Sequence, residues 1–364
     1  MIVRRDVLKG LAASGAAACL PGRPSPSAAA AAPAEIARIG AVAEKAGITF
    51  GTAFDRSALD NPDYARLIAT HARVLTTDYS LKFGPLRGDG LTADFTWTDR
   101  MMDFGEKAGI PVRGHALIWN EGNPTWLAKL SSERRAYWLD RHITEVMDRY
   151  WGRMHSWDVV NEPFWPGHGH KGGFRGGPWF DAMGPDYIYR AFARAHRVEP
   201  NARLVLNEAF TEAATPLGLE VRQNLLRLVD EIKSRGLRLD AVGLQGHIRD
   251  MNPFDPDGWR KFLGELAARD VEIWITEMDV DDRLFKGTTA ERDARCAEVW
   301  RAMLDIALDQ PKVTTVITWE LADRFSSYVD EYGPTTRPLL FDEHLKPKPS
   351  YHAVIAALEA RRRR

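Results

Sequence analysis

Short apolar runs alternate with longer amphipathic stretches along the chain from about residue 36 onward. The apolar runs are continuous rather than alternating, which is typical of strands in a parallel sheet that is covered on its outer side. They lie near residues 48–51, 73–75, 112–115, 156–160, 204–206, 241–244, 272–275 and 313–317.

The stretches between these runs carry apolar residues at three- and four-residue spacing, as amphipathic helices do. The clearest cover residues 132–151, which open with a Ser-Glu start signal, 217–235, which Gly236 ends, and 290–308. Eight strand–helix units in about 330 residues favour one α/β domain, a single (β/α)8 barrel, over two smaller domains.

Polar and ionisable side chains follow most of the predicted strands. In a (β/α)8 barrel the loops after the strands build the active site. A barrel that served only as a scaffold would not need ionisable groups at most of its strand ends. The residues at these positions are Asp78, Lys82, His115, Trp119, Asn161, Glu162, Asn207, Glu208, Gln245, His247, Glu277, Asp279 and Trp319.

Two of the predicted strands end on a glutamate, Glu162 and Glu277. Core packing does not explain them, because an unpaired buried charge costs several kcal/mol. Two carboxylates about 5–5.5 Å apart at a barrel mouth can hydrolyse a glycosidic bond with retention, one as nucleophile and one as acid/base. We assign Glu277 as the nucleophile, because His247 and Asp279 can orient it and keep it charged. Glu162, which follows Asn161, is then the acid/base.

Four segments around these residues resemble glycoside hydrolase family 10, the retaining endo-β-1,4-xylanases with a (β/α)8 fold. They are Arg-Gly-His-Ala-Leu-Ile-Trp at 113–119, Trp-Asp-Val-Val-Asn-Glu at 157–162, Gly-Leu-Gln-Gly-His at 243–247 and Ile-Thr-Glu-Met-Asp at 275–279. Weaker matches follow at 317–319, Asp323, 338–342 and 346–349. The likeness runs in order through essentially the whole chain after the leader.

The resemblance implies a role for each matching residue. Glu162 resembles the family's acid/base and Glu277 its nucleophile, whereas Asn161 resembles the asparagine that binds the sugar 2-hydroxyl. His247 and Asp279 match the pair that supports the nucleophile. The residues that match the walls and hydrogen-bonding groups of the sugar site are Lys82, His115, Trp119, Gln245 and Trp319. The reaction implied is hydrolysis of internal β-1,4-xylosidic bonds by double displacement, without a cofactor or metal.

The chain departs from the family pattern mainly around the more distant glycone sugar. The usual Glu-Asn before the subsite lysine is Asp78-Tyr79, and Trp-His-x-Gln is Trp-Asn-Glu-Gly at 119–122. The Asn-Asp-Tyr-Asn pattern is Asn-Glu-Ala-Phe at 207–210, and Ser327 or Tyr328 replaces a second tryptophan. A site that lacks hydrogen-bond partners discriminates among sugars differently. The alternative substrate is therefore another β-glycan, such as a bacterial exopolysaccharide, cleaved by the same mechanism.

The first residues read as a leader rather than as part of the barrel. Arg4-Arg5 opens a basic segment, an apolar run follows to Leu20, and an Ala/Pro-rich tract ends near Ala34. This resembles a twin-arginine export signal, with an apolar run too short for a stable membrane anchor. We therefore expect residues 1–34 to be a signal and spacer, residues 35–364 to be the catalytic domain, and the protein to be periplasmic or secreted.

Composition narrows the remaining classes. The net charge is −1 and the basic residues are scattered, so nothing indicates a nucleic-acid or anionic membrane surface. Beyond the leader only Cys296 remains, so no disulfide is expected. We expect a monomer whose partner is a polysaccharide, with no attached carbohydrate-binding module.

Two further functions would fit parts of the pattern. His71, His115 and His247 could belong to a metal-dependent barrel hydrolase, but the chain lacks the His-x-His and bridging lysine that such sites use. An inactive glycan-binding barrel is the other, and the presence of both glutamates argues against it.

Overall fold

The computed structural model describes residues 36–249 and 254–362, and eight parallel strands in this part form a closed barrel. Each pairs with its neighbour, and β10 closes the ring by pairing with both β9 and β1. Short strands β4 (Ile118–Trp119) and β8 (His247–Arg249) extend the edges of β5 and β9. In ring order the eight strands are β1 (Thr49–Phe54), β2 (Val74–Thr77), β3 (Val112–Gly114), β5 (Met154–Asn161), β6 (Leu204–Glu208), β7 (Ala241–Leu244), β9 (Glu272–Asp281) and β10 (Val313–Thr318). All eight predicted strands are present.

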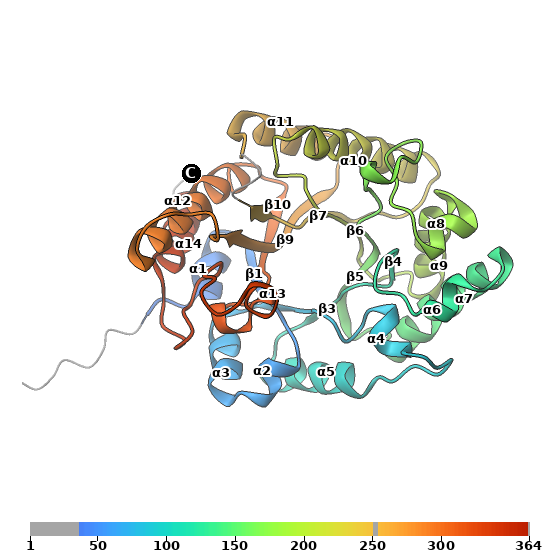
Figure 1. The fold of residues 1–364 in the computed structure, drawn as a ribbon, viewed down its shortest axis with the longest axis horizontal. Coiled ribbons are helices and arrows are strands. Elements are labelled where there is room, and N and C mark those ends of the chain that lie inside the picture. The colour runs from blue at the N-terminus through green and yellow to red at the C-terminus, as the bar shows by residue number, and fades with distance from the viewer. Residues whose placement is uncertain (1–35, 250–253, 363–364) are drawn as a thin grey trace, which may run out of the picture. The chain divides into compact units, whose positions relative to one another are not determined.

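Helices surround the barrel on its outside (Figure 1). The three predicted long helices are confirmed: Ser131 caps the first, Gly236 follows the second with φ 69°, and Thr288 with Glu291 forms a capping box on the third. The α-helices are α1 (Ile39–Lys45), α2 (Arg56–Asp60), α3 (Pro62–His71), α4 (Phe83–Arg87), α5 (Thr96–Ala108), α6 (Thr125–Ala128), α7 (Ser132–Arg149), α8 (Pro178–Met183), α9 (Asp186–Val198), α10 (Pro216–Ser234), α11 (Pro256–Ala267), α12 (Thr289–Ala307), α13 (Ser327–Tyr332) and α14 (Pro349–Arg362). Two 3₁₀ turns, η1 (Pro166–His168) and η2 (Asp323–Phe325), complete the elements.

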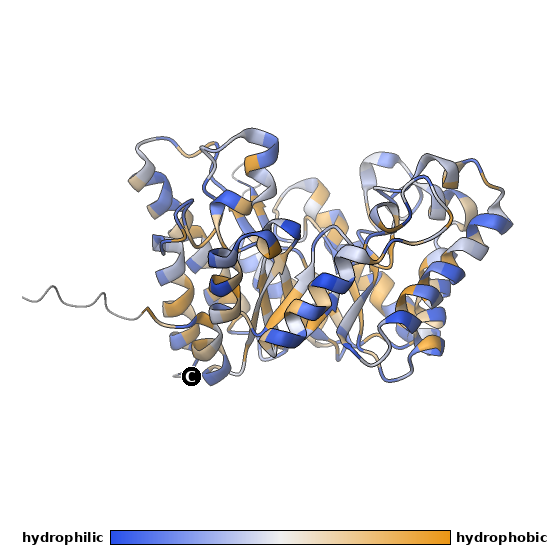
Figure 2. Ribbon diagram, turned by 90° about the horizontal axis from the view of Figure 1, so that it is seen from below, coloured by the Kyte–Doolittle hydropathy of each residue, from blue (hydrophilic) through white to orange (hydrophobic). Residues whose placement is uncertain are grey.

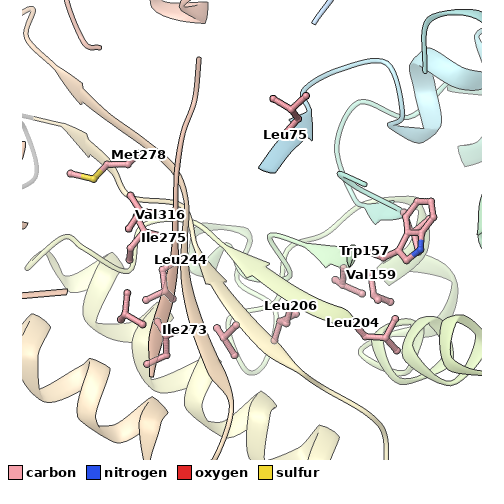
Figure 3. Packing of buried hydrophobic residues seen from close by; sticks show 14 of the residues in the cluster. Leu75, Trp157, Val159, Leu204, Leu206, Leu244, Ile273, Ile275, Met278 and Val316 are labelled. Atoms are coloured by element: carbon pink, nitrogen blue, oxygen red, sulfur yellow. The ribbon is translucent and has the colours of Figure 1, made fainter. Parts of the chain in front are cut away.

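The main core lies between the strands and the helices. Figure 2 shows apolar strands at the centre and polar outer faces on the surrounding helices. Leu204, Leu206 and Ile275 belong to this layer and are fully buried (Figure 3). Val205, between two of these residues, belongs to a separate small cluster, because successive strand residues point to opposite faces.

The inner face of the barrel is polar toward the carboxyl ends of the strands. Asn207 follows Val205 by two positions and therefore points inward as well. Asp158 pairs with Val205 in register, and Arg113 contacts Asp158 through its guanidinium. These three buried polar residues form the base on which the mouth of the barrel is built.

The two glutamates have different positions relative to their strands. Glu162 directly follows β5, as predicted, with a left-handed φ of 49°. Glu277 was predicted to end its strand, and this is wrong: β9 continues to Asp281. The strand is longer because β8 pairs with its last residues, with His247 opposite Asp279.

The leader predicted for residues 1–34 lies outside the described residues. Within 36–249 and 254–362, no helix combines the length and apolarity that a membrane crossing requires.

Candidate active site

The ten residues to which the family resemblance gives a role all lie at one end of the barrel, where the strands finish. They come from strands far apart in the chain, and the closed ring of strands brings them together. The group comprises Lys82, His115, Trp119, Asn161, Glu162, Gln245, His247, Glu277, Asp279 and Trp319.

Glu277 is buried and is surrounded by donors. Asn207 Nδ2 donates to its Oε1 over 2.6 Å, and His247 Nε2 lies 3.3 Å from its Oε2. His115 Nδ1 lies 4.0 Å from Oε1. The other ring nitrogen of His247 lies 2.9 Å from Asp279 Oδ2, so His247 joins Asp279 to the Glu277 carboxylate.

These neighbours decide the charge of Glu277. Burial alone raises the pKa of a carboxyl group, but the positive charges of His115, His247 and Lys82 and the His247 hydrogen bond outweigh it, and the pKa of Glu277 falls to about 2. Burial likewise works against a charged His247. Asp279 and Glu277 nevertheless raise the pKa of His247 well above its usual value. The two groups thus favour each other's charged form, the carboxylate of Glu277 and the protonated ring of His247.

Glu162 has a different environment. Gln245 Nε2 donates to its Oε1 over 2.8 Å, Trp119 Nε1 donates to Oε2 over 3.2 Å, and Arg175 Nη2 lies 3.0 Å from Oε2. Arg175 Nε also donates to the carbonyl of Glu162 over 2.9 Å, and the Glu162 N–H donates to Asn207 over 2.8 Å. These backbone bonds hold a residue whose left-handed conformation is otherwise uncommon.

A chain of amide groups connects the two carboxylates. Asn161 Oδ1 accepts from Asn207 Nδ2 over 2.8 Å and from Gln245 Nε2 over 3.4 Å. Asn207 also donates to Glu277, and Gln245 to Glu162. Since the carbonyl of Asn161 is occupied by these donors, its amide nitrogen is the end left for other contacts; it lies 3.4 Å from Glu162 Oε1.

His115 is fixed from below by the polar interior of the barrel. Its Nδ1 lies 2.6 Å from Asp158 Oδ2, and Arg113 Nη2 lies 2.5 Å from the same oxygen. Both side chains of the Arg113–Asp158 pair are fully buried, so His115 has one rigid orientation toward Glu277.

Lys82 and two tryptophans form one wall of the site. Lys82 Nζ lies 5.0 Å from the ring centre of Trp119 and 5.7 Å from that of Trp319. His115 meets Trp319 edge to face at 5.3 Å. The wall thus combines flat apolar faces with a cation, as a site for a hydroxylated ring requires.

Several contributors were not identified from sequence. Asn207 was placed at a strand end but given no role, and it bridges Asn161 and Glu277. Arg175 lies in the Gly-rich loop 167–177, where no periodicity or motif marked it. Tyr328, considered only as a replaced tryptophan, is buried and its hydroxyl lies 3.5 Å from Asp279 Oδ1. In each case the signal is spatial, because the partner is distant in sequence.

The residues that depart from the family pattern have other tasks. Tyr79 is 56% exposed. Asn120 Oδ1 accepts the backbone N–H groups of Trp179 and Phe180 over 3.1 and 3.3 Å, which attaches it to the start of α8. Gly122 has φ 63° and lies beside the Trp119 ring.

Of the three histidines of the metal alternative, His115 and His247 lie beside Glu277, and His71 lies apart from them. His71 ends α3, at the opposite end of the barrel from the site, and its Nδ1 accepts the N–H of Ile39 over 3.2 Å. Within residues 36–249 and 254–362, no group of three or more His, Cys, Asp or Glu side chains is arranged to bind a metal ion.

Comparison with known proteins agrees with this geometry. The model of glycosyl hydrolase family 10 matches residues 38–357. The chain belongs to glycosyl hydrolase family 10. The family-10 chain is 28% identical over 324 residues to endo-1,4-beta-xylanase B of Thermotoga neapolitana, covering 87% of this chain and 90% of that protein. It is 29% identical over 302 residues to a beta-1,4-xylanase of Dictyoglomus thermophilum, covering 80% and 84% of the two chains.

Solved structures give the same result. Native xylanase 10B of Thermotoga maritima superposes with a TM-score of 0.81 at 28% identity, covering 90% of this family-10 chain and 99% of that one. Xylanase 10B of Thermotoga petrophila RKU-1, solved in complex with xylobiose, gives the same TM-score, identity and coverage.

Proposed function

We propose that this protein is a retaining endo-β-1,4-xylanase that hydrolyses internal β-1,4-xylosidic bonds by double displacement. The observation that carries the proposal is the pair of glutamates in unlike environments within a family-10 barrel. Glu277 is held ionised by His115, His247 and Lys82. Glu162 borders the open pocket beside the site. The two family-10 relatives compared above carry xylanase names, and one solved relative binds xylobiose.

In the first step the Glu277 carboxylate attacks the anomeric carbon, and the bond from that carbon to the leaving oxygen breaks. Glu162 gives its proton to this oxygen, so the leaving chain departs as an alcohol. A glycosyl ester on Glu277 remains, with the anomeric configuration inverted. His247 and Asp279 keep the attacking carboxylate oriented.

In the second step a water molecule attacks the same carbon from the side the leaving group vacated. Glu162, now a carboxylate, accepts the proton from water, and the ester bond to Glu277 breaks. The second inversion restores the original configuration, so the product retains the β anomer. The amide of Asn161 serves the 2-hydroxyl, and Lys82, Trp119, Gln245 and Trp319 bind the glycone sugar.

The test is a product profile on several polysaccharides. The purified enzyme is incubated with xylan and, in parallel, with β-glucan, mannan and bacterial exopolysaccharides, and oligosaccharides are separated by size. We expect xylan to give a ladder of xylo-oligosaccharides, and NMR of the nascent products to show the β anomer first. Faster release of oligosaccharides from another β-glycan would show that this glycan, and not xylan, is the substrate. An α anomer among the nascent products would refute the retaining mechanism.

We propose further that the protein is exported as a monomer and acts without a metal or cofactor. Export is supported by the twin arginines at residues 4–5. Replacing both with lysine should keep the protein in the cytoplasm of a bacterium with a twin-arginine pathway, as cell fractionation would show. Full export of this variant would contradict the twin-arginine route. A dimer in sedimentation would contradict the monomer.

A further inference from the structure

A pocket of about 520 Å³ lies beside the catalytic residues. It shares Trp119, Glu162, Gln245 and His247 with the site, and Trp165 and Phe210 also line it. Glu277, the proposed nucleophile, does not line it. The acid/base touches the oxygen between the two halves of the substrate, so a pocket on the Glu162 side receives the half that leaves.

Glu212 is a buried carboxyl at this pocket. It is 2% exposed, borders the pocket, and its Oε2 has no hydrogen-bond partner among the described residues. Buried polar atoms are nearly always paired, so a lone carboxyl oxygen at a cavity indicates a partner that arrives with a ligand. Burial raises the pKa of Glu212 to about 7, against the opposing charges of His247, Arg249 and Arg222.

The backbone around Glu212 is fixed rather than free to move the carboxyl elsewhere. Arg222, on α10, donates from Nε to the carbonyl of Thr211 over 2.6 Å and from Nη2 to the carbonyl of Glu212 over 3.2 Å. Arg222 is itself buried. Glu212 is thus held in place by bonds to its main chain, and its side chain is left for the pocket.

We propose that Glu212 is a specificity-determining residue that hydrogen-bonds a hydroxyl group of the first leaving-group sugar. Trp165 and Phe210, whose rings lie 5.2 Å apart at 58°, supply apolar surfaces for the pyranose beside it. This inference rests on the proposed xylanase function and adds a residue that the catalytic scheme does not use.

Two substrates separate this role from a structural one. Xylopentaose places a sugar with hydroxyl groups in the pocket, whereas nitrophenyl β-xylobioside places an aromatic ring without hydroxyl groups there. For Glu212→Ala we expect kcat/KM on xylopentaose to fall about 10- to 100-fold, the range of a lost hydrogen bond to a charged group, and on the aryl glycoside by less than about threefold. Glu212→Gln keeps an acceptor and should recover most of the loss.

A second readout uses the covalent intermediate. With added xylobiose as acceptor, the glycosyl-enzyme partitions between water and transfer to the sugar, which must bind in the same pocket. Glu212→Ala should reduce transfer relative to hydrolysis about 10-fold or more. Glu298→Ala, which removes an exposed carboxylate on α12, is the matched control. It should change neither the ratio of transfer to hydrolysis nor the ratio of kcat/KM on the two substrates.

Equal losses on both substrates, or no loss on xylopentaose, would overturn the role of Glu212 while leaving the xylanase proposal intact. A wild-type enzyme that cleaves the aryl glycoside but not xylopentaose would instead overturn the xylanase proposal, and the inference with it.

Discussion

Two carboxylates in this barrel, Asp323 and Glu277, are both buried but have different kinds of partner. We call Asp323, Arg337 and Lys348 the C-terminal clamp. In it Lys348 Nζ lies 2.9 Å from Asp323 Oδ2 and donates to the carbonyl of Arg337 over 2.7 Å, and Asp323 accepts the N–H of Leu339 over 2.9 Å. In the active site Glu277 is 4% exposed, against 2% for Asp323.

The difference lies in the partners. In the clamp, Asp323 and Lys348 bind main-chain groups as well as each other. These bonds fix the segment that leads from β10 to α14. Among the residues that the structure describes, the Glu277 carboxylate contacts side chains only: Asn207 and His247 hydrogen-bond it, and His115 lies 4.0 Å away. Burial of a carboxylate therefore does not mark a catalytic group by itself. A buried carboxylate that accepts from side chains and is kept ionised by nearby cations can act as a nucleophile. A buried carboxylate that binds backbone groups stabilises the chain instead.

The strongest test of this contrast removes the nucleophile. Glu277→Ala should lower kcat on xylan by a factor on the order of 10⁴ or more, because no carboxylate is left to form the glycosyl ester. Reducing-sugar release measures the activity, and thermal unfolding should show that the fold persists. Glu277→Gln is the isosteric control and should be equally inactive. Full activity in either variant would refute the assignment.

Glu162→Ala should separate the two chemical steps. Loss of a general acid/base costs about 10²- to 10⁴-fold on substrates that need protonation of the leaving group. An aryl glycoside with a good leaving group needs little of it, so we expect a fast phenolate burst followed by slow deglycosylation. Stopped-flow absorbance shows the burst, and azide, which needs no base, should restore turnover as a glycosyl azide. Absence of both burst and rescue would contradict the role.

Lys348→Met tests the clamp. It removes the nearer cation of the buried Asp323 and leaves only Arg337 Nη1, 3.9 Å away. Breaking a buried pair in this way costs up to about 3–5 kcal/mol of the free energy of unfolding. Urea unfolding measures this, while kcat of the folded fraction should remain close to wild type. Adding Asp323→Asn removes the orphan charge and should restore part of the stability. A Lys348→Met protein that loses activity while its free energy of unfolding stays at the wild-type value would place the clamp in the active site.

The smallest effect concerns a histidine that packs against the same C-terminal segment. His71 meets Phe341 at 5.1 Å, and burial lowers the pKa of His71 from 6.5 to about 4. The unfolded chain then binds a proton more readily, so stability is lost as pH falls through 6.5 and levels off near 4. Between pH 7.5 and 5.5 this amounts to about 1 kcal/mol.

His71→Asn keeps an acceptor for the Ile39 N–H but cannot titrate. We expect unfolding free energies measured across this range to have a shallower pH dependence in the variant. His247, whose pKa is raised, contributes with the opposite sign in this window, but it is present in both proteins. Only the difference between the two slopes therefore reports His71, and equal slopes would show that His71 does not shape the acid limb.

Much of the fold could be predicted because its signals are local. Eight apolar runs and the helices at 132–151, 217–235 and 290–308 follow from periodicity and caps, which depend on neighbours a few residues apart. The end of β9 could not be predicted in this way, since it depends on pairing with β8 some thirty residues earlier. The candidate residues at the mouth were identified because strand ends and motifs are also local.

What the sequence determined by itself is the barrel, the positions of its strands and the nomination of Glu162 and Glu277. The hydrogen-bond partners of these groups follow only from the tertiary structure. They include the amide chain through Asn207 and the contact of Arg175 with Glu162, and Glu212 Oε2 has no partner among the described residues. Hydrogen bonds at the mouth join residues up to 84 positions apart. Their geometry depends on the register of a closed ring of strands, and no single segment of the sequence contains that register.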